Sequence, residues 1–458
     1  PYQFRPVMKL ISADRPRLLI ADDVGVGKTI EAGLIIKELQ ARQPLQSVLV
    51  ICPKQLVVEH KWRNELRRFD EDFVELDSAT LRYCIDETRL EGRWPTRYAK
   101  AILPYSLLDE RLLLGSDTGR KKSHGLVSLV PPATFDLVVV DEAHHLRNTD
   151  TWRHRCVRHL LDSAEASVLI SATPIQTGAG DLFNLLQLLR PDILTDHEQF
   201  ERMREPNAFI ASAEEIARRG DPDWQANALV ELEAALQTTW GAAVLASDPR
   251  SERTRDVLES TEATDETRVA AVRALQGLNT FSGLINRTRR RDIGEFAVRR
   301  AETIEVDFTP EQESVHKELI DIGARIVSRS QPTMSIEFLL STLKRQASSC
   351  INGLAPFVNA MLEGRLSEEE LSEAGVEGEL LPSDVLVELR NEIRALAERA
   401  ADLEDDPKID ALLSVIAEKQ EMANNKLLVF STFRHTLAYL LPRLEDAGVC
   451  VGLVHGAV

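Results

Sequence analysis

The sequence lacks long apolar runs, paired cysteines and any export signal. No stretch reaches the about 18–20 uninterrupted apolar residues that a membrane span needs, and nothing near residue 1 resembles a signal peptide. The five cysteines are scattered without a C-x-x-C pair, which argues against a zinc site or a disulfide framework. These absences predict a cytoplasmic protein with buried thiols and no membrane partner.

Positive charge is also outweighed, because 55 Lys and Arg stand against 73 Asp and Glu, a formal net charge of −18. Lys and Arg are the side chains that bind phosphate backbones, so the total alone argues against a nucleic-acid partner. The excess of acidic residues is concentrated in one region, however: residues 363–406 hold fifteen acidic residues and four arginines. In contrast, RTRRRDIGEFAVRR, residues 287–300, holds six arginines and two acids. This stripe is either a contact for a polyanion or a solvated face.

Short apolar runs alternate with helical patterns over the first part of the chain, residues 1–193. The strand candidates are RLLIA, SVLVICP, KAILPY, FDLVVVDE and SVLISAT. They are apolar on consecutive residues, which is typical of strands that helices cover on both faces. TIEAGLIIKELQ and LVVEHKWRNELRRF have the apolar spacing of amphipathic helices. The pattern predicts an α/β fold with a parallel sheet.

The character of the sequence changes after residue 193. Residues 194–300 predict a mainly helical insertion that ends in the Arg-rich segment, and residues 301–424 predict a strand at AETIEVDFT followed by a helical protrusion or linker with an acidic stretch. Residues 425–458 predict a strand, a helix and a strand, the start of a second α/β unit that stops before it could bury its own faces. The helical regions are either protrusions that clamp a ligand or packing layers.

IADDVGVGKTIEAG nearly matches the phosphate-binding pattern G-x-x-x-x-G-K-[ST], with Asp22 in place of the first glycine. It joins a predicted strand to a predicted helix, so backbone N–H groups and the helix N-terminus would face one concavity. Gly25 and Gly27 would let the backbone approach phosphate oxygens. Lys28 would bind the β and γ phosphates, and Thr29 would be a Mg²⁺ ligand. The alternative is an ordinary turn with a surface lysine.

FDLVVVDEAHH places Asp141 and Glu142 at the C-terminal end of a predicted strand, where parallel sheets bind their ligands. Asp141 is expected to orient Mg²⁺, and Glu142 to orient and deprotonate the attacking water. Alone, the pair also suits a helix N-cap with a first-turn acid. His144 and His145 have no partners at zinc spacing, and neither a G-x-S-x-G nor an H-E-x-x-H motif occurs. The two motifs together predict hydrolysis of a nucleoside triphosphate.

DDVGVGKT, DEAH and SATPIQT, in this order, resemble the motor motifs of superfamily-two helicase-like ATPases of the Swi/Snf type, and of its bacterial RapA-like branch. In that family the loop begins with Asp-Glu, so Asp22 and Asp23 are characteristic. The resemblance implies a RecA-like P-loop lobe with helical insertions, the beginning of a second RecA-like lobe, and ATP and Mg²⁺ as cofactors. PYQ resembles the adenine-recognition element. The implied nucleotide contacts are Gln3, Asp23, Gly25, Val26, Gly27, Lys28, Thr29 and Ile30.

Three further motifs extend the resemblance. SATPIQTGAG resembles the third motif, in which Ser171 and Thr173 link hydrolysis to lobe movement, and His144 of DEAH is given the same coupling role. VLVICPKQLVVEH resembles a motif that lies along nucleic acid, with Lys54 as the candidate contact. NRTRRRDIGEF resembles the Arg-rich segment before the inter-lobe region. Its candidate nucleic-acid contacts are Arg287, Arg289 and Arg290.

The resemblance implies an ATP-dependent nucleic-acid motor, a DNA-stimulated ATPase and double-stranded DNA translocase in the nucleoid. A motor that steps along any sequence must contact phosphates rather than bases, so DNA backbone contacts are expected. RNA polymerase or other protein subunits are further expected partners. The later second-lobe motifs, including the arginine finger, do not occur in residues 1–458, so we expect weak ATPase activity. Two alternatives stay open: a translocating or helicase subunit of a restriction or phage-defence system, and an ATP-switched RNA polymerase-binding protein.

Overall fold

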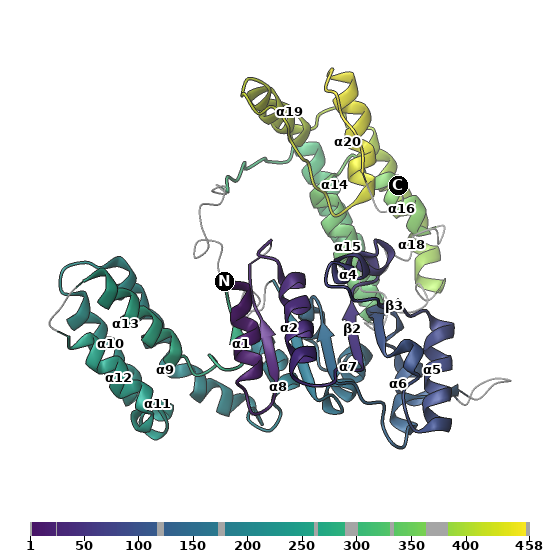
Figure 1. The fold of residues 1–458 in the computed structure, drawn as a ribbon. Helices are drawn as coiled ribbons and strands as arrows, with labels where there is room; N and C mark the ends of the chain where they lie inside the picture. The colour runs from purple at the N-terminus through teal and green to yellow at the C-terminus, as the bar shows by residue number, and fades with distance from the viewer. Residues whose placement is uncertain are drawn as a thin grey trace. The chain divides into compact units, whose positions relative to one another are not determined.

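The computed structural model describes residues 2–23, 25–116, 123–172, 179–260, 264–288, 301–329, 334–362 and 383–454. The chain divides into two compact units, Pro1–Val298 and Arg299–Val458 (Figure 1). The first unit contains a parallel sheet, the helices that cover it and a helical insertion. The described part of the second unit is helical, with irregular segments between the helices. Every described helix falls short of the length or apolar character that a membrane span requires.

A seven-stranded parallel sheet forms the centre of the first unit, in the order β3-β4-β2-β7-β8-β1-β9 (Figure 1). Its strands are β1 (Arg17–Ile20), β2 (Val48–Cys52), β3 (Val74–Glu75), β4 (Lys100–Pro104), β7 (Leu137–Val140), β8 (Ala166–Ile170) and β9 (Ile285–Asn286). The five strands predicted from apolar runs are all present, so the predicted α/β fold with a parallel sheet is confirmed. A separate antiparallel pair consists of β5 (Gly115–Ser116) and β6 (Ser123–His124).

Both faces of the sheet are buried, which explains why its strands are apolar on consecutive residues. Along β1, Leu18 and Ile20 belong to one hydrophobic core and Leu19 belongs to the other. Because side chains alternate along a strand, the same division recurs in β2 and β7. One core includes residues of α1 (Arg5–Ile11), α2 (Lys28–Arg42) and α4 (Lys61–Arg67). The other includes residues of α5 (Ser78–Glu91), α6 (Glu110–Leu114), α7 (Trp152–Asp162) and α8 (Ala179–Leu189).

The amphipathic helix expected over LVVEHKWRNELRRF is two helices in the structure. α3 (Lys54–Val58) and α4 are separated at His60, whose φ of 51° lies in the left-handed region. His60 is held there by its Nδ1, which lies 2.8 Å from both Glu75 carboxylate oxygens. A non-glycine residue at positive φ interrupts the helical hydrogen-bond ladder, which apolar spacing alone does not reveal.

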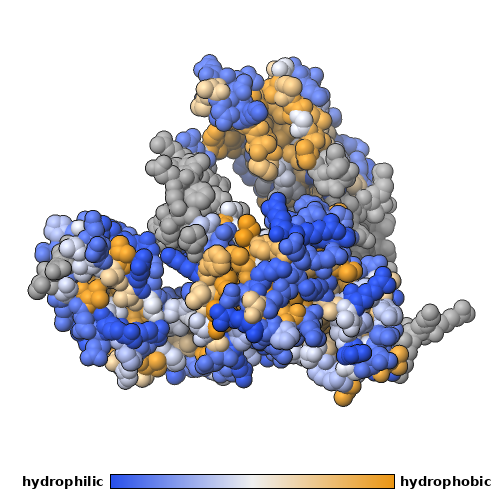
Figure 2. All heavy atoms as spheres, in the orientation of Figure 1, coloured by the Kyte–Doolittle hydropathy of each residue, from blue (hydrophilic) through white to orange (hydrophobic). Residues whose placement is uncertain are grey.

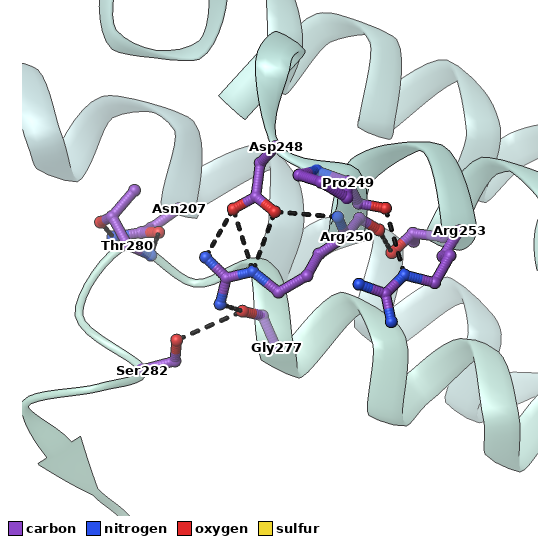
Figure 3. A network of polar contacts seen from close by, with 9 residues as sticks. Asn207, Asp248, Pro249, Arg250, Arg253, Gly277, Thr280 and Ser282 are labelled. Atoms are coloured by element: carbon purple, nitrogen blue, oxygen red, sulfur yellow. Dashed lines mark hydrogen bonds and ion pairs between the residues drawn. The ribbon is translucent and has the colours of Figure 1, made fainter. Parts of the chain in front are cut away.

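The insertion predicted to be mainly helical has its own core. It consists of α9 (His197–Arg219), α10 (Trp224–Gln237), α11 (Thr239–Ala243), α12 (Pro249–Leu258) and α13 (Asp265–Leu278). Figure 3 shows the network at its base, where Arg250 binds the Asp248 carboxylate and donates to the Gly277 carbonyl at 2.9 Å. Asn207 exchanges two hydrogen bonds with Thr280, at 2.7 and 2.9 Å. These bonds fix the segment that leads from α13 back to β9.

The second unit packs four helices around a core of its own: α14 (Pro310–Arg329), α15 (Met334–Ser349), α16 (Leu354–Leu362) and α18 (Ser383–Ala401). α19 (Pro407–Gln420) and α20 (Arg434–Asp446) follow. Asp406 caps α19 by accepting hydrogen bonds from the backbone N–H groups of Lys408 and Ile409. It also accepts a hydrogen bond from the Tyr439 hydroxyl at 2.8 Å, and this joins α19 to α20.

The strands predicted in the second unit are wrong. Residues 301–309, 425–431 and 449–454 form no strand, although the helix between the last two segments is present as α20. Leu428 and Phe430 are 82% and 87% exposed, and Figure 2 shows hydrophobic residues on the surface near α19 and α20. An apolar run becomes a strand only beside a hydrogen-bonding partner. The described part of the second unit provides none, so only α20 represents the expected beginning of a second RecA-like lobe.

Candidate nucleotide-binding site

The predicted phosphate loop connects β1 to α2, as its role requires. Gly25 and Gly27 have φ angles of 85° and 102°, a region that favours glycine. Gly27 is also the N-cap of α2, so the helix N-terminus, with its partial positive charge, opens at the loop. A Cβ added at Gly27 would lie 2.6 Å from Gln3 Nε2. The positive φ therefore demands glycine at this position, whereas the Gln3 side chain would only have to move.

The N-terminal residues of the chain lie against the loop. η1, a 3-10 helix (Tyr2–Phe4), directs two donors to the Val26 carbonyl oxygen: the Tyr2 hydroxyl at 3.2 Å and Gln3 Nε2 at 3.3 Å. Val26 is buried, and Ile30 donates its backbone N–H to the Gly27 carbonyl at 2.9 Å. The residues of the predicted adenine-recognition element thus contact the phosphate loop directly.

Asp22 and Glu31 bury two neighbouring carboxyl groups beneath the loop. Both side chains are 0% exposed, and no donor among the described residues reaches Asp22 Oδ2 or either Glu31 oxygen. Burial and the neighbouring Asp22 carboxylate raise the pKa of Glu31 to about 9. Glu31 therefore carries a proton at neutral pH. Lys28 Nζ donates to the Asp22 carbonyl oxygen at 3.1 Å, which places the ammonium group within the loop.

The acidic motif follows β7, and three elements hold Asp141. Trp62 Nε1 of α4 donates to Asp141 Oδ2 at 2.8 Å, and the Glu142 backbone N–H donates to Oδ1 at 2.8 Å. The Tyr105 hydroxyl donates to the Asp141 carbonyl at 2.8 Å. Asp141 is 8% exposed, and burial raises its pKa. A bound cation would oppose this shift because it favours the ionised carboxylate.

Glu142 differs from Asp141 because it is half-buried and adopts a φ of 48°. His144 Nδ1 lies 3.2 Å from Glu142 Oε2, and this contact lowers the pKa of Glu142. The Lys28 ammonium group lowers the same pKa. Since β1 and β7 are parallel strands of one sheet, the loop after β1 and the acidic motif after β7 lie at the same edge of that sheet. Glu142 is ionised at neutral pH.

Strand order sets the space between these two motifs. β8 lies between β1 and β7, so the two motifs are separated by two inter-strand spacings, about 10 Å. Ser171, at the end of β8, is fully buried, and its backbone N–H donates to the Ile20 carbonyl oxygen at 2.9 Å. This places the predicted coupling residue between the two motifs. Its predicted companion Thr173 lies outside the described residues.

The residues present suit a triphosphate with Mg²⁺. A glycine-lined helix N-terminus with Lys28 matches the charge of phosphates, and the Thr29 hydroxyl and the Asp141 carboxylate are the oxygen ligands that Mg²⁺ prefers. No group of three or more His, Cys, Asp or Glu side chains suited to a metal occurs in the described part of the chain.

The predicted nucleic-acid contacts are placed only in part. Lys54 at the start of α3 and Arg287 after β9 are exposed, while Arg289 and Arg290 lie outside the described residues. Parallel strands put Lys54 and Arg287 at the same edge of the sheet as the phosphate loop. Asp23, predicted as a nucleotide contact, donates its backbone N–H to the Thr288 carbonyl at 3.1 Å.

Sequence reasoning missed the side chains that support the motifs. Trp62 and Tyr105 hold Asp141, and Glu31 lies beside Asp22 under the loop. Trp62 and Tyr105 are far from DEAH in the chain, and no local pattern links them to it. Glu31 offered one indication, because a charged residue on the apolar face of a helix is rarely buried unless it has a role.

A sequence model of the SNF2-related domain matches residues 2–354, most of the chain. The chain belongs to the SNF2-related domain family. This agrees with the resemblance to Swi/Snf-type helicase-like ATPases that the motifs carry. The match begins at the residues that contact the phosphate loop and includes both the loop and the acidic motif.

This SNF2-related chain is similar in sequence to curated RapA proteins and has matches among solved structures. It is 32% identical over 241 residues to the RNA polymerase-associated protein RapA of Yersinia pseudotuberculosis, and 31% identical to that of Yersinia pestis. Each alignment covers 51% of this chain and 23% of the relative. A solved Sulfolobus solfataricus SWI2/SNF2 ATPase core in complex with dsDNA gives a TM-score of 0.39 at 17% identity over 93% of this chain and 76% of that one. The solved structure of the UvsW helicase of bacteriophage T4 gives a TM-score of 0.26 at 9% sequence identity. That comparison covers 41% of this chain and 56% of the helicase chain.

Proposed function

We propose that this chain is the ATP-binding part of a DNA-stimulated ATPase that moves along double-stranded DNA. The observation that carries the proposal is that the phosphate loop follows β1 and the acidic motif follows β7, at one edge of a parallel sheet with only β8 between those strands. A phosphate-binding loop and a water-activating carboxylate at the carboxyl ends of nearby parallel strands are the arrangement that hydrolysis of a nucleoside triphosphate needs. Membership of the SNF2-related domain family supports the same reaction.

Each group has one role in hydrolysis. The N-terminal turn of α2 and Lys28 bind the β and γ phosphates. Thr29 and Asp141 would hold Mg²⁺, which neutralises phosphate charge when bound. Glu142, kept ionised by His144 and Lys28, orients the attacking water and accepts its proton. Ser171 lies between the two motifs and passes changes at the phosphates to β1 and β8.

DNA is the proposed partner because exposed cations share an edge of the sheet with the ATP site. Lys54 and Arg287 follow β2 and β9, which are four strand spacings apart, or about 19 Å. Contacts of this kind reach the phosphate backbone and depend steeply on salt. Arg287→Ala should lower the slope of log affinity against log salt by about 1. Arg219→Ala, which removes an exposed arginine of α9, is the matched control and should leave the slope unchanged.

The deciding experiment is ATPase activity with and without duplex DNA, for the parent chain and for Glu142→Gln. The parent should have weak turnover that DNA stimulates, because residues 1–458 lack the arginine-finger motif. Glu142→Gln should lower that turnover about 10²- to 10⁴-fold while it retains ATP binding. Turnover of Glu142→Gln at the parental rate would refute the assigned chemistry. ATPase activity that ignores DNA would refute the motor. An assay for strand separation then distinguishes translocation from unwinding.

A second candidate is an ATP-switched protein that docks on RNA polymerase. The RNA polymerase-associated name of the RapA relatives favours it. Loss of polymerase binding in Lys28→Ala, together with an ATPase that DNA never stimulates, would support this alternative over the motor. DNA-stimulated ATPase that requires a nuclease subunit would instead indicate a restriction or phage-defence system.

A further inference from the structure

Residues 284–288 run beside β1 and continue along the phosphate loop past the end of that strand. Three backbone hydrogen bonds make this ladder, from the N–H groups of residues 19, 21 and 23 to the carbonyl oxygens of residues 284, 286 and 288, at 2.8, 2.7 and 3.1 Å. Lys9 Nζ adds a bond to the Ile285 carbonyl at 2.8 Å. The segment is therefore hydrogen-bonded to β1 and to the first residues of the phosphate loop.

The Asp22 side chain joins this segment to the loop a second time. Its Oδ1 accepts hydrogen bonds from the Thr288 backbone N–H at 2.8 Å and from Asn286 Nδ2 at 3.2 Å. All three residues are at most 2% exposed, so water does not compete for these bonds. Arg287 lies between the two donors and is exposed. A single carboxylate thus binds the Asn286 side chain and the Thr288 backbone, on either side of an exposed arginine.

The main-chain carbonyl of the same aspartate faces the nucleotide site. It accepts the Lys28 Nζ hydrogen bond at 3.1 Å. A phosphate bound by Lys28 would share the ammonium group with the Asp22 carbonyl, because a lysine has three N–H donors. One residue, Asp22, therefore lies between the phosphate-binding ammonium group and the Arg287 segment.

We propose that Asp22 is a positioning residue that couples the phosphate loop to the Arg287 segment, so that ATP and a polyanion at Arg287 each change the affinity of the other. The inference rests on the proposed function, because it assigns Arg287 to the DNA surface. The coupling is reciprocal by thermodynamic necessity, and factors of about 5 to 150 are typical of such linkage. Asp22 itself contacts neither ligand in this arrangement.

The test measures the affinity of the full chain for a fluorescent, non-hydrolysable ATP analogue with Mg²⁺, without and with saturating duplex DNA. The ratio of the two dissociation constants is the coupling factor. The parent should give a factor of at least about 5. Asp22→Ala should bring it within twofold of 1, whereas Asp22→Asn should retain most of it. The asparagine oxygen can still accept both hydrogen bonds, and its amide nitrogen would face Glu31.

Glu71→Gln is the matched control, because Glu71 is also a buried acid of this unit but bonds to Lys37 and Lys100. It should lower the melting temperature and leave the coupling factor unchanged. If Asp22→Ala does not fold, Asn286→Ala removes one of the two donors and should give an intermediate factor. A parental factor in a folded Asp22→Ala overturns this inference alone. A parent that binds the analogue with no effect of DNA overturns both this inference and the proposed function.

Discussion

The two ends of the central sheet bury carboxyl groups in opposite surroundings. Near the amino end, where β4 begins at Lys100, Glu71 receives hydrogen bonds from Lys37 at 2.6 Å and Lys100 at 2.5 Å. Burial by itself would raise the pKa of Glu71, but these bonds outweigh it and lower the pKa. At the carboxyl end, Glu31 has the Asp22 carboxylate for a neighbour, and its pKa rises to about 9. The same residue type is therefore an ion-pair partner at one end and a neutral acid at the other.

This difference distinguishes the end of the sheet where the protein itself compensates a buried carboxylate from the end where we propose that ATP binds. Glu71 is compensated within the protein, so it needs nothing from outside. Asp22, Glu31, Asp141 and Glu142 share one end, where Lys28 acts on both glutamates, Lys9 on Asp22 and Lys61 on Asp141, yet the pKa values of Glu31 and Asp141 are still raised. Perturbed pKa values concentrate where a ligand is to complete the charge balance. The perturbed carboxyl groups at this end support the proposal that ATP and Mg²⁺ bind there.

The largest difference in ATPase activity is expected between two tryptophan-to-phenylalanine variants, one at the carboxyl end of the sheet and one near its amino end. Trp62→Phe removes the donor to Asp141 Oδ2, and loss of such a supporting hydrogen bond at a metal site typically costs about 10- to 100-fold. We expect ATPase activity to fall by that factor at limiting Mg²⁺. Trp94→Phe removes a hydrogen bond to the Tyr98 carbonyl near the amino end and should change activity less than twofold. Equal losses of ATPase activity in the two variants would contradict the proposal that only the carboxyl end of the sheet serves the ATP site.

Glutamine substitutions should change stability in opposite directions. Glu71→Gln weakens two charge-assisted bonds and should lower the free energy of unfolding by about 1–3 kcal/mol at pH 7. Glu31→Gln replaces a buried acid that must take up a proton on folding at pH 7 with an amide of similar shape that needs none, so the free energy of unfolding should rise. Urea titration of both variants measures the contrast. Destabilisation of Glu31→Gln by as much as Glu71→Gln would show that Glu31 is ionised.

The pH dependence of stability gives a finer test. Glu31 has a folded pKa of about 9 against 4.5 unfolded, so its contribution is complete below pH 4.5 and is lost as pH rises toward 9. The slope is at most about 1.4 kcal/mol per pH unit, and Glu31→Gln should remove it. Glu71 has a lowered pKa, so its contribution is present above pH 4.5 and is lost as pH falls. Unfolding at about pH 3, 5, 7 and 8.5 checks both signs, because the Glu71 contribution is lost only below pH 4.5. A Glu31→Gln slope identical to the parent would contradict the assignment.

The smallest effect is expected from one lysine of the amino end. Lys37 is 40% exposed and shares Glu71 with Lys100, so Lys37→Ala should lower the free energy of unfolding by only about 0.5–1 kcal/mol. Arg42→Ala removes an exposed i,i+4 pair with Glu38 on the same helix and should cost less. Thermal unfolding of the two variants measures which loses more stability. A larger loss for Arg42→Ala than for Lys37→Ala would show that Lys100 alone compensates the Glu71 charge.

The core of the first unit could be predicted from sequence because its information is local. Consecutive apolar residues indicate strands buried on both faces, and all five predicted strands are present. The loop glycines could be predicted for the same reason, since the positive φ angles of Gly25 and Gly27 suit that residue. The strand expected at NKLLVFSTF failed although its run is equally apolar. Partner strands, not composition, decide whether such a run pairs.

The two chemical motifs and their strand ends follow from the sequence by itself, because glycine, lysine and carboxylate act through short-range backbone geometry. The supports of those motifs were decided only by tertiary structure. Trp62 reaches Asp141 because the chain breaks its helix at His60 and packs α4 near the end of β7. Asp22 meets Thr288 across more than 260 residues because β9 joins the sheet beside β1. Such pairings depend on which strand lies next to which, and no local pattern records that choice.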